Sequence, residues 1–246
     1  MQKIKSLFLV LTLSIFLTTC SDTSTNQKEI SLEELYKNAV NDAIIAESNE
    51  KVDNLIAINN NNNYIRRKVI NGKNLIQVLT FTKYRNSYPV GDTIQTSWGE
   101  TWVTVSPELY DYFKQKNISN DSILNLRIHQ CLGLPYDNSY KYIVEMWVDP
   151  DSLFRPSPDN EINDSSADLE FPENVSDEYK SWFNNNILNS YFPSTNKASK
   201  YPWTRLGYTY NWAFGENEIG LSEFVIKRKT KVIITFNGTA FEYFNN

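Results

Sequence analysis

Histidine and cysteine are the scarcest chemically reactive residues in this chain. There is one histidine, His129, and there are two cysteines, Cys20 and Cys131. A zinc site built on several histidines is therefore excluded by the count. His129 and Cys131 stand two residues apart on a segment with helical spacing, so their side chains point apart and a Cys/His catalytic pair is disfavoured. We expect Cys131 to be buried and unreactive.

Basic residues are outnumbered as well. The chain has 24 lysines and arginines against 29 acidic residues, which gives a formal net charge of −5. Because binding to phosphates needs a basic face, this balance disfavours nucleic acid as a partner. Hydrophobic residues make up 41% of the chain and aromatic residues 14%, which is enough for the core of one folded domain.

Long apolar runs are lacking, apart from one short run near the N-terminus. Lys3 and Lys5 precede an apolar run from Leu7 to Leu17, shorter than the roughly 20 residues of a membrane-spanning helix. This is the layout of a secretory signal peptide. The sequence Leu17-Thr-Thr-Cys20 resembles the lipobox of bacterial lipoproteins, which implies removal of residues 1–19 and attachment of acyl chains such as palmitate to Cys20.

That resemblance also implies a location. The mature protein would lie on the exported side of the bacterial cell envelope and would contact the membrane through lipidated Cys20. An ordinary signal peptide with an incidental cysteine, or an uncleaved anchor, is the alternative. If Cys20 is modified, Cys131 is the one cysteine left, and an intramolecular disulfide is excluded.

The segment that follows divides into three parts. Residues 20–30 are polar and predict a lipidated, flexible tether. Ser31 and Glu34 have the spacing of a capping box, and an apolar stripe after them predicts an amphipathic helix over residues 31–58. Five asparagines at 59–63 mark a break. Residues 64–246 then form the predicted domain.

The pattern within this domain predicts an α+β fold: a single domain with a mainly antiparallel sheet and several helices. Helices are expected from Ser106, over residues 124–132 and from Ser176. The predicted strands are a hairpin around Asn71-Gly72, a strand over 94–105 with a bulge at Gly99, a buried strand over 141–148, and a C-terminal meander from 220 to 244 that turns at 227–231 and at Asn237-Gly238.

Four segments carry a second resemblance. They are WGETWVTVSPEL (98–109), EMWVDPDSLFRPSPDNEI (145–162), YPWTRLGYTYNW (201–212) and GLSEFVI (220–226). They look like segments of a group of exported bacterial proteins to which no activity has been assigned. The likeness covers roughly residues 80–244, which favours one domain, and it implies no functional residue.

The acidic stretch after residue 158 has the spacing of a calcium loop. Its oxygen-bearing residues occupy positions 1, 3, 5, 7 and 12 of a twelve-residue loop: Asp159, Glu161, Asn163, Ser165 and Glu170. Calcium is therefore the one cofactor that the sequence suggests. Against it, Asp164 occupies the position of the usual glycine, and Pro156 and Pro158 forbid an entering helix. The alternative is a stiff, solvated surface loop that Arg155 pins to the domain.

Catalysis is left open by the sequence, and we lean towards a non-catalytic protein. A pair of carboxylates could hydrolyse glycans of the envelope or outside the cell. In addition, GLSEFVIKRKTKVIIT (220–235) looks like the glutamate-bearing strand, turn and strand of ADP-ribosyltransferase domains, and LFRPSPD resembles their arginine segment. That resemblance implies that Arg155 would hold the pyrophosphate of NAD and Glu223 its ribose.

A binding or structural component of the envelope is the main prediction, with a carbohydrate or a protein as its ligand. Aromatic residues crowd positions 203–214, and aromatic faces stack well on sugar rings and apolar side chains. Alternation along a strand would place Trp203 and Arg205 on one face, opposite a buried face. The candidate ligand-binding residues are thus Trp203, Arg205 and Arg155, although a role for most of these aromatics in the core is the alternative.

Overall fold

The computed structural model describes residues 30–137, 139–195 and 199–245. The unit discussed below is Ser31–Asn246. The predicted signal peptide, the predicted lipobox with Cys20 and nearly all of the predicted tether lie outside the described residues. Within those residues, no helix has both the length and the apolar character that crossing a bilayer requires.

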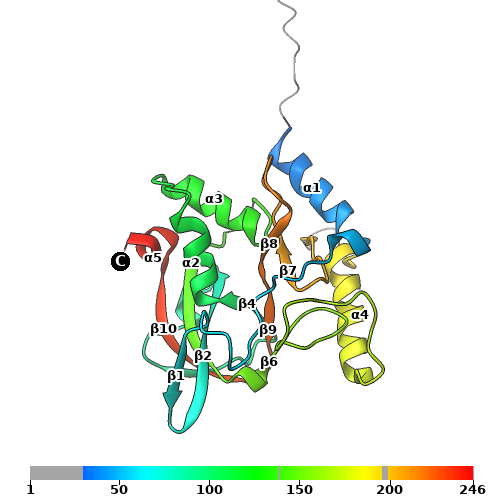
Figure 1. Cartoon of the computed structure of the whole chain (residues 1–246). Helices are drawn as coiled ribbons and strands as arrows, with labels where there is room; N and C mark the ends of the chain where they lie inside the picture. The colour runs from blue at the N-terminus through cyan, green and yellow to red at the C-terminus, as the bar shows by residue number, and fades with distance from the viewer. Residues whose placement is uncertain (1–29, 138, 196–198, 246) are drawn as a thin grey trace, which may run out of the picture. The chain divides into compact units, whose positions relative to one another are not determined.

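An eight-stranded sheet organises the domain (Figure 1), and all its pairings are antiparallel. Its strands follow the order β3-β10-β5-β2-β4-β9-β6, with β1 paired to β2. Their bounds are β1 Arg67–Ile70, β2 Lys73–Thr82, β3 Thr93–Gln95, β4 Thr101–Val105, β5 Tyr142–Val148, β6 Leu153–Phe154, β9 Phe224–Ile226 and β10 Lys231–Thr239. A second sheet pairs β7 (Tyr208–Tyr210) with β8 (Ile219–Ser222).

Five α-helices accompany the sheets in the described residues, so the fold is α+β, as predicted. They are α1 Leu32–Asp42, α2 Ser106–Lys114, α3 Asp121–Cys131, α4 Asp177–Tyr191 and α5 Ala240–Asn245. Short 3-10 turns occur at Ser48–Glu50, Arg85–Ser87 and Pro150–Ser152.

The predicted helix starts at Ser31 and Ser176 and the predicted hairpin at Asn71-Gly72 are confirmed. The hydroxyls of Ser31 and Ser176 accept the backbone N–H of the residue three positions on, which begins α1 and α4. Asn71 and Gly72 both have positive φ, 51° and 76°, and join β1 to β2 in a two-residue hairpin.

The first helix is shorter than the predicted 31–58. It ends at Asp42, and the chain beyond residue 50 is irregular. There the backbone N–H groups of Leu55 and Ile58 donate to the carbonyls of Ser165 and Ile162. Because these bonds tie the segment to a distant loop, its backbone does not need helical partners.

Residues 94–105 are two strands and not one bulged strand. β3 pairs with β10, whereas β4 pairs with β2 and β9. Gly99, with φ of 145°, lies between them and lets the chain pass from one edge of the sheet to its middle. The prediction of a bulge was therefore wrong: Gly99 lies in the connection between two strands that are not neighbours in the sheet.

The C-terminal meander was also predicted incorrectly. Asn237 and Gly238 do not turn but continue β10, opposite Val144 and Ile143. The amide of Asn237 donates to the carbonyls of Arg85 and Tyr88, so its side chain holds the loop after β2. Residues after Thr239 form α5 and not a strand. β9 and β10 are not neighbours in the sheet.

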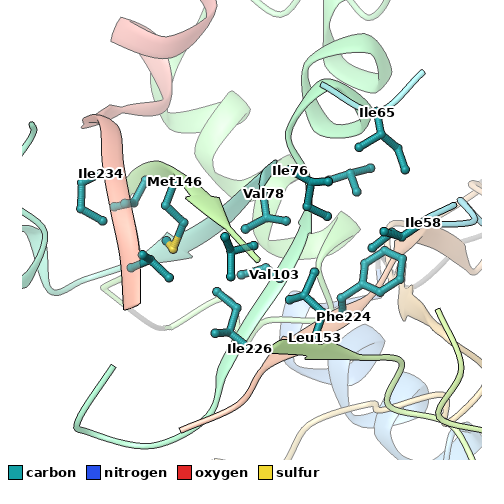
Figure 2. Close-up of a cluster of buried hydrophobic side chains, with 14 of the residues drawn as sticks. Ile58, Ile65, Ile76, Val78, Val103, Met146, Leu153, Phe224, Ile226 and Ile234 are labelled. Atoms are coloured by element: carbon teal, nitrogen blue, oxygen red, sulfur yellow. The ribbon is translucent and has the colours of Figure 1, made fainter. Parts of the chain in front are cut away.

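Two apolar clusters cover opposite faces of the sheet. Alternation along β2 sends Ile76 and Val78 into the first cluster and Leu79 and Phe81 into the second. Figure 2 shows the first cluster, whose members come from strands and connecting segments. The second cluster packs the sheet against α2, α3 and α5. A third cluster surrounds α4 and includes Trp203.

Candidate functional site

A pocket of about 430 Å³ lies against β2 and β4. Its other walls come from α4, from residues 132–134 and from the segment 201–210. Three tryptophans, five tyrosines and Phe81 line it. Two carboxylates, those of Glu100 and Glu223, also line it, while the described lining residues include no lysine, arginine or histidine. The pocket is therefore aromatic and acidic.

Trp102 and Trp203 form two adjoining walls. Trp102 belongs to β4, and Trp203 precedes β7, where it forms a bridge with Thr209. Their ring centroids lie 5.8 Å apart, with an angle of 85° between the ring planes. Trp182 of α4 packs against both rings: its ring centroid lies 6.3 Å from that of Trp102 and 6.2 Å from that of Trp203. The two rings are thus held by packing in an edge-to-face arrangement.

Glu223 occupies the junction between β8 and β9. β8 pairs with β7 and β9 with β4, so the chain changes partner at this residue. Its backbone N–H donates to the Gly207 carbonyl at 2.8 Å. Its Oε2 atom is buried and has no hydrogen-bond partner. Burial raises the pKa of Glu223 to about 8.

Two further buried polar atoms of pocket residues lack partners. They are the indole N–H of Trp203 and the amide nitrogen of Asn186 on α4. Buried polar atoms in folded proteins are nearly always paired, and each unpaired one costs about 1–3 kcal/mol. Three such atoms thus belong to residues that come from different elements and line one pocket.

A second buried carboxylate lies next to this site but is fully engaged by the protein. Glu108 of α2 accepts the backbone N–H and the hydroxyl of Ser222, both at 3.0 Å, and the hydroxyl of Thr104 at 2.8 Å. Burial raises its pKa to about 7. Since these bonds join α2, β4 and β8, we assign Glu108 a structural role.

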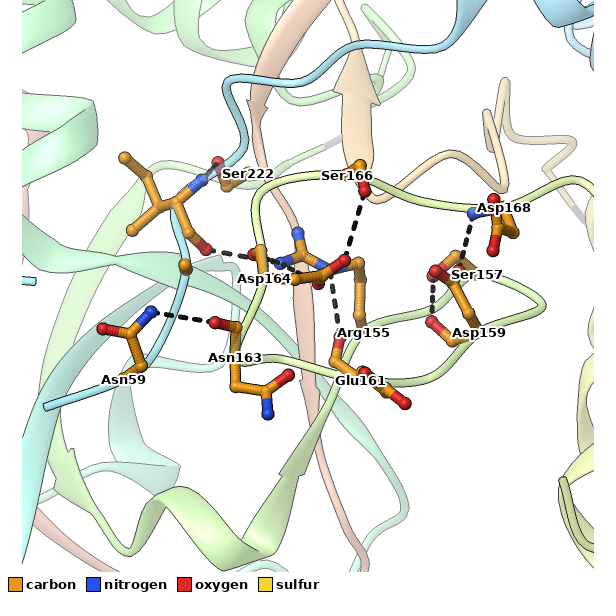
Figure 3. A network of polar contacts seen from close by, with 12 residues as sticks. Asn59, Arg155, Ser157, Asp159, Glu161, Asn163, Asp164, Ser166, Asp168 and Ser222 are labelled. Atoms are coloured by element: carbon orange, nitrogen blue, oxygen red, sulfur yellow. Dashed lines mark hydrogen bonds and ion pairs between the residues drawn. The ribbon is translucent and has the colours of Figure 1, made fainter. Parts of the chain in front are cut away.

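Arg155 organises the acidic loop (Figure 3). Its side chain is fully buried. Nε donates to the Glu161 carbonyl at 3.0 Å, and Nη2 donates to the carbonyls of Asp164 at 2.8 Å and Ile56 at 3.4 Å. The guanidinium lies 5.1 Å from the centre of the Phe224 ring. Desolvation lowers the pKa of Arg155, with Asp164 and Asp159 opposing the shift.

The loop therefore differs from the predicted solvated connection. Residues 153–159 are all buried, while Glu161, Asn163 and Glu170 are exposed. Carbonyl groups wrapped around one guanidinium explain how a charged, proline-rich stretch can lie inside the domain. Arg155 does not line the aromatic pocket, whereas Glu223 does. The pair expected of an ADP-ribosyltransferase is thus not brought together in this pocket.

The candidate calcium ligands are used in other ways. The Asp159 carboxylate accepts the backbone N–H of Asp168 at 2.8 Å. Asn163 contributes its backbone carbonyl to Asn59, and Ser165 contributes its own to Leu55. Among the described residues, no three side chains of His, Cys, Asp or Glu are grouped so that they could hold a metal ion. Calcium binding by this loop stays a prediction.

Trp203 and Arg205 do not form the exposed face that alternation predicted. Trp203 is only 5% exposed. Arg205 has a positive φ of 61°, and its Nη2 donates to the carbonyls of Ala43 and Ile44 at the end of α1. Residues 203–207 are not a strand, since β7 begins at Tyr208, so the alternation did not apply. Trp203 remains a pocket residue, and Arg205 holds α1.

The cysteine and the histidine are packed inside the domain. Cys131 is buried, and burial raises the pKa of its thiol. His129 Nδ1 lies 2.8 Å from the Asn125 carbonyl, and its ring packs edge-on against Phe81. Neither side chain lines the pocket.

Sequence reasoning missed Asn186 and Glu100 as members of a site. Asn186 ends a run of three asparagines on α4, and nothing in that run singles it out. Glu223 was named only through a resemblance. Searches with family models, among curated proteins and among solved structures find no match to this chain.

Proposed function

We propose that this protein is a lipid-anchored lipoprotein of the bacterial cell envelope whose domain binds a carbohydrate in the aromatic pocket. The observation that carries the proposal is the coincidence of aromatic walls with three unpaired buried polar atoms. The anchor rests on the lipobox resemblance, and the ligand rests on the geometry of the pocket.

A sugar ring suits this pocket for two physical reasons. The apolar faces of a pyranose stack on indole rings, such as those of Trp102 and Trp203, with little loss of conformational entropy. Its hydroxyls both donate and accept hydrogen bonds, so they could satisfy the Glu223 carboxyl and the Asn186 amide together. The volume of about 430 Å³ falls in the range of small-ligand sites, roughly 300–1,000 Å³.

The charge of the pocket disfavours anionic ligands. The described lining includes two acidic residues and no basic residue that could balance a phosphate or a pyrophosphate. This argues against NAD and therefore against the ADP-ribosyltransferase alternative.

The test is a glycan-array screen of the full chain in detergent, followed by titration of tryptophan fluorescence. We compare two substitutions of exposed aromatic residues: Trp98→Ala, in the pocket, and Phe214→Ala, outside it. Trp98 is 49% exposed and Phe214 76%, so neither change should unfold the domain. Trp98→Ala should weaken binding at least tenfold, and Phe214→Ala should leave it unchanged. Equal effects, or no saturable glycan binding, would contradict the proposal.

A second candidate function is glycoside hydrolysis. Its support is that Glu223 and Glu100 line one pocket, and that Glu223, with a pKa near 8, keeps its proton at neutral pH as a general acid must. Aryl glycosides would test it by release of the coloured phenol. Turnover that Glu223→Gln abolishes, without loss of sugar binding, would favour the hydrolase over a binding protein.

A further inference from the structure

The unpaired carboxylate in the pocket is unusual within this domain. Glu108 accepts three hydrogen bonds, and Asp159 accepts the N–H of Asp168. Glu145, which is 7% exposed, accepts from Gln77, Ser106 and Tyr243. Glu223, in contrast, has an oxygen that accepts from no described group. These other carboxylates accept hydrogen bonds, and the buried Oδ1 of Asp164 lies 3.8 Å from Arg155 Nη2, whereas the described residues give Glu223 Oε2 no such partner.

Without a partner, Glu223 keeps its proton, because an unpaired charge is costly in an apolar site. A cation entering the pocket would change that balance by pairing with the carboxylate. The surroundings favour such a ligand: Glu100 adds a second acidic group, and the faces of Trp102 and Trp203 attract positive charge. The described lining has no basic side chain that would repel it.

The other two unpaired atoms define the rest of the ligand. The Trp203 indole N–H and the Asn186 amide are donors, so they need acceptor oxygens. A simple alkylammonium ion has none. A polyhydroxylated ring provides such oxygens together with an apolar face for the tryptophans.

We infer that the pocket selects an amino sugar with a free ammonium group, with Glu223 as its counter-ion and with Trp203 and Asn186 donating to its hydroxyl oxygens. This inference rests on the proposed carbohydrate-binding function. It narrows the ligand class from sugars in general to sugars that carry a free, unacetylated amine.

Selection of this kind makes binding depend on pH in a defined direction. Because burial raises the pKa of Glu223 to about 8, the carboxyl is protonated below that pH, and a cationic ligand must displace the proton. Affinity should rise as pH rises from 5 to 7, by up to tenfold per unit, and about one proton should leave for each ligand bound.

Other groups near Glu223 could contribute to this dependence. Tyr191 of α4 interacts electrostatically with Glu223 and with Arg205, whose guanidinium lies 5.5 Å from the centre of the Tyr191 ring. Tyr210 and Glu100 share the pocket. The phenol pKa values of Tyr191 and Tyr210 are raised by burial, which keeps both neutral over this range. Glu108 bonds to the adjacent Ser222 and has a pKa near 7, so a variant of Glu223 is needed to separate the two.

The experiment is isothermal titration of the full chain in detergent with glucosamine, glucose and N-acetylglucosamine, three rings that differ only at one substituent. Titrations at pH 5, 6 and 7, each in two buffers of different ionisation enthalpy, count the protons released. We expect glucosamine to bind at least tenfold more tightly than either neutral sugar at pH 7, with proton release. Glu223→Gln should abolish the preference, the pH dependence and the proton release. Glu173→Gln, an exposed carboxylate outside the pocket, should change none of them.

The outcomes separate the two proposals. Equal binding of the three sugars would overturn this inference and leave the carbohydrate proposal standing, whereas no binding of any of them would overturn the inference while the glycan array decides the broader proposal. A preference for glucosamine that survives in Glu223→Gln would also overturn it. If that variant does not fold, proton release by the unaltered protein still decides: its absence would refute the role of Glu223.

Discussion

At the scale of single residues, Glu223 links the site to the stability of the domain. A carboxyl whose pKa is raised on folding, from an ordinary value near 4.5 to about 8, binds its proton more tightly in the folded state. The folded state is therefore favoured at low pH, and this advantage is lost as pH rises from about 4.5 to 8. A glutamine at this position has no proton to lose.

We therefore predict that Glu223→Gln is more stable than the unaltered protein at pH 8.5, by an amount on the order of a few kcal/mol, and differs much less at pH 5. Urea denaturation of both proteins at the two pH values measures this difference. Glu108 titrates in both proteins, so its contribution cancels. Parallel stability curves from pH 5 to 8.5 would contradict the prediction.

Arg155 differs from Glu223 because its buried charged group donates hydrogen bonds to carbonyl groups. Replacing it with alanine leaves the carbonyls of Glu161 and Asp164 without their donor and opens a cavity beside Phe224. We predict a loss of about 3–5 kcal/mol in the free energy of unfolding. Urea denaturation tests this, with Arg228→Ala as the control because Arg228 is exposed. A loss below 1 kcal/mol for Arg155→Ala would show that the loop does not depend on it.

At the scale of elements, the contact between β7 and β8 is unusually close. A methyl group on Gly220 would lie 2.2 Å from Thr209 Oγ1 and 2.5 Å from the carbonyls of Cys131 and Thr209. That hydroxyl also donates to the Cys131 carbonyl at 2.7 Å and accepts from the Leu221 N–H at 2.9 Å. Gly220 thus permits one threonine to join the small sheet to the end of α3.

Gly220→Ala should consequently destabilise the domain by about 3 kcal/mol or more, since backbone atoms cannot move aside cheaply. Gly215→Ala is the comparison: it has open space around it but a positive φ, so its cost should be only about 1 kcal/mol. Thermal melting of both variants measures the contrast. Equal melting temperatures would mean that β7 and β8 can separate without loss.

At the scale of the whole molecule, the sequence predicts those features that depend on neighbouring residues alone, such as helix caps and tight turns. Ser31 and Ser176 act as helix caps wherever the chain runs, and Asn71-Gly72 turns by its own backbone preference. The crossing at Gly99 and the continuation of β10 through Asn237 depend instead on which distant strand is available. The pocket is of this second kind, because Asn186, Trp203 and Glu223 meet only through the tertiary fold.

Attachment to the membrane through lipidated Cys20 is a proposal, and it belongs to the scale of the whole molecule. We predict that the protein, expressed in a bacterial host with labelled palmitate, carries the label and sediments with membranes. Cys20→Ala should lose both, because each buried methylene contributes about 0.8 kcal/mol to membrane binding and no acyl chain would remain. Cys131→Ala is the matched control, since Cys131 is buried and should not be acylated. Label retained in Cys20→Ala, or missing from the unaltered protein, would refute the lipoprotein proposal and leave the sugar pocket to be judged by its own experiments.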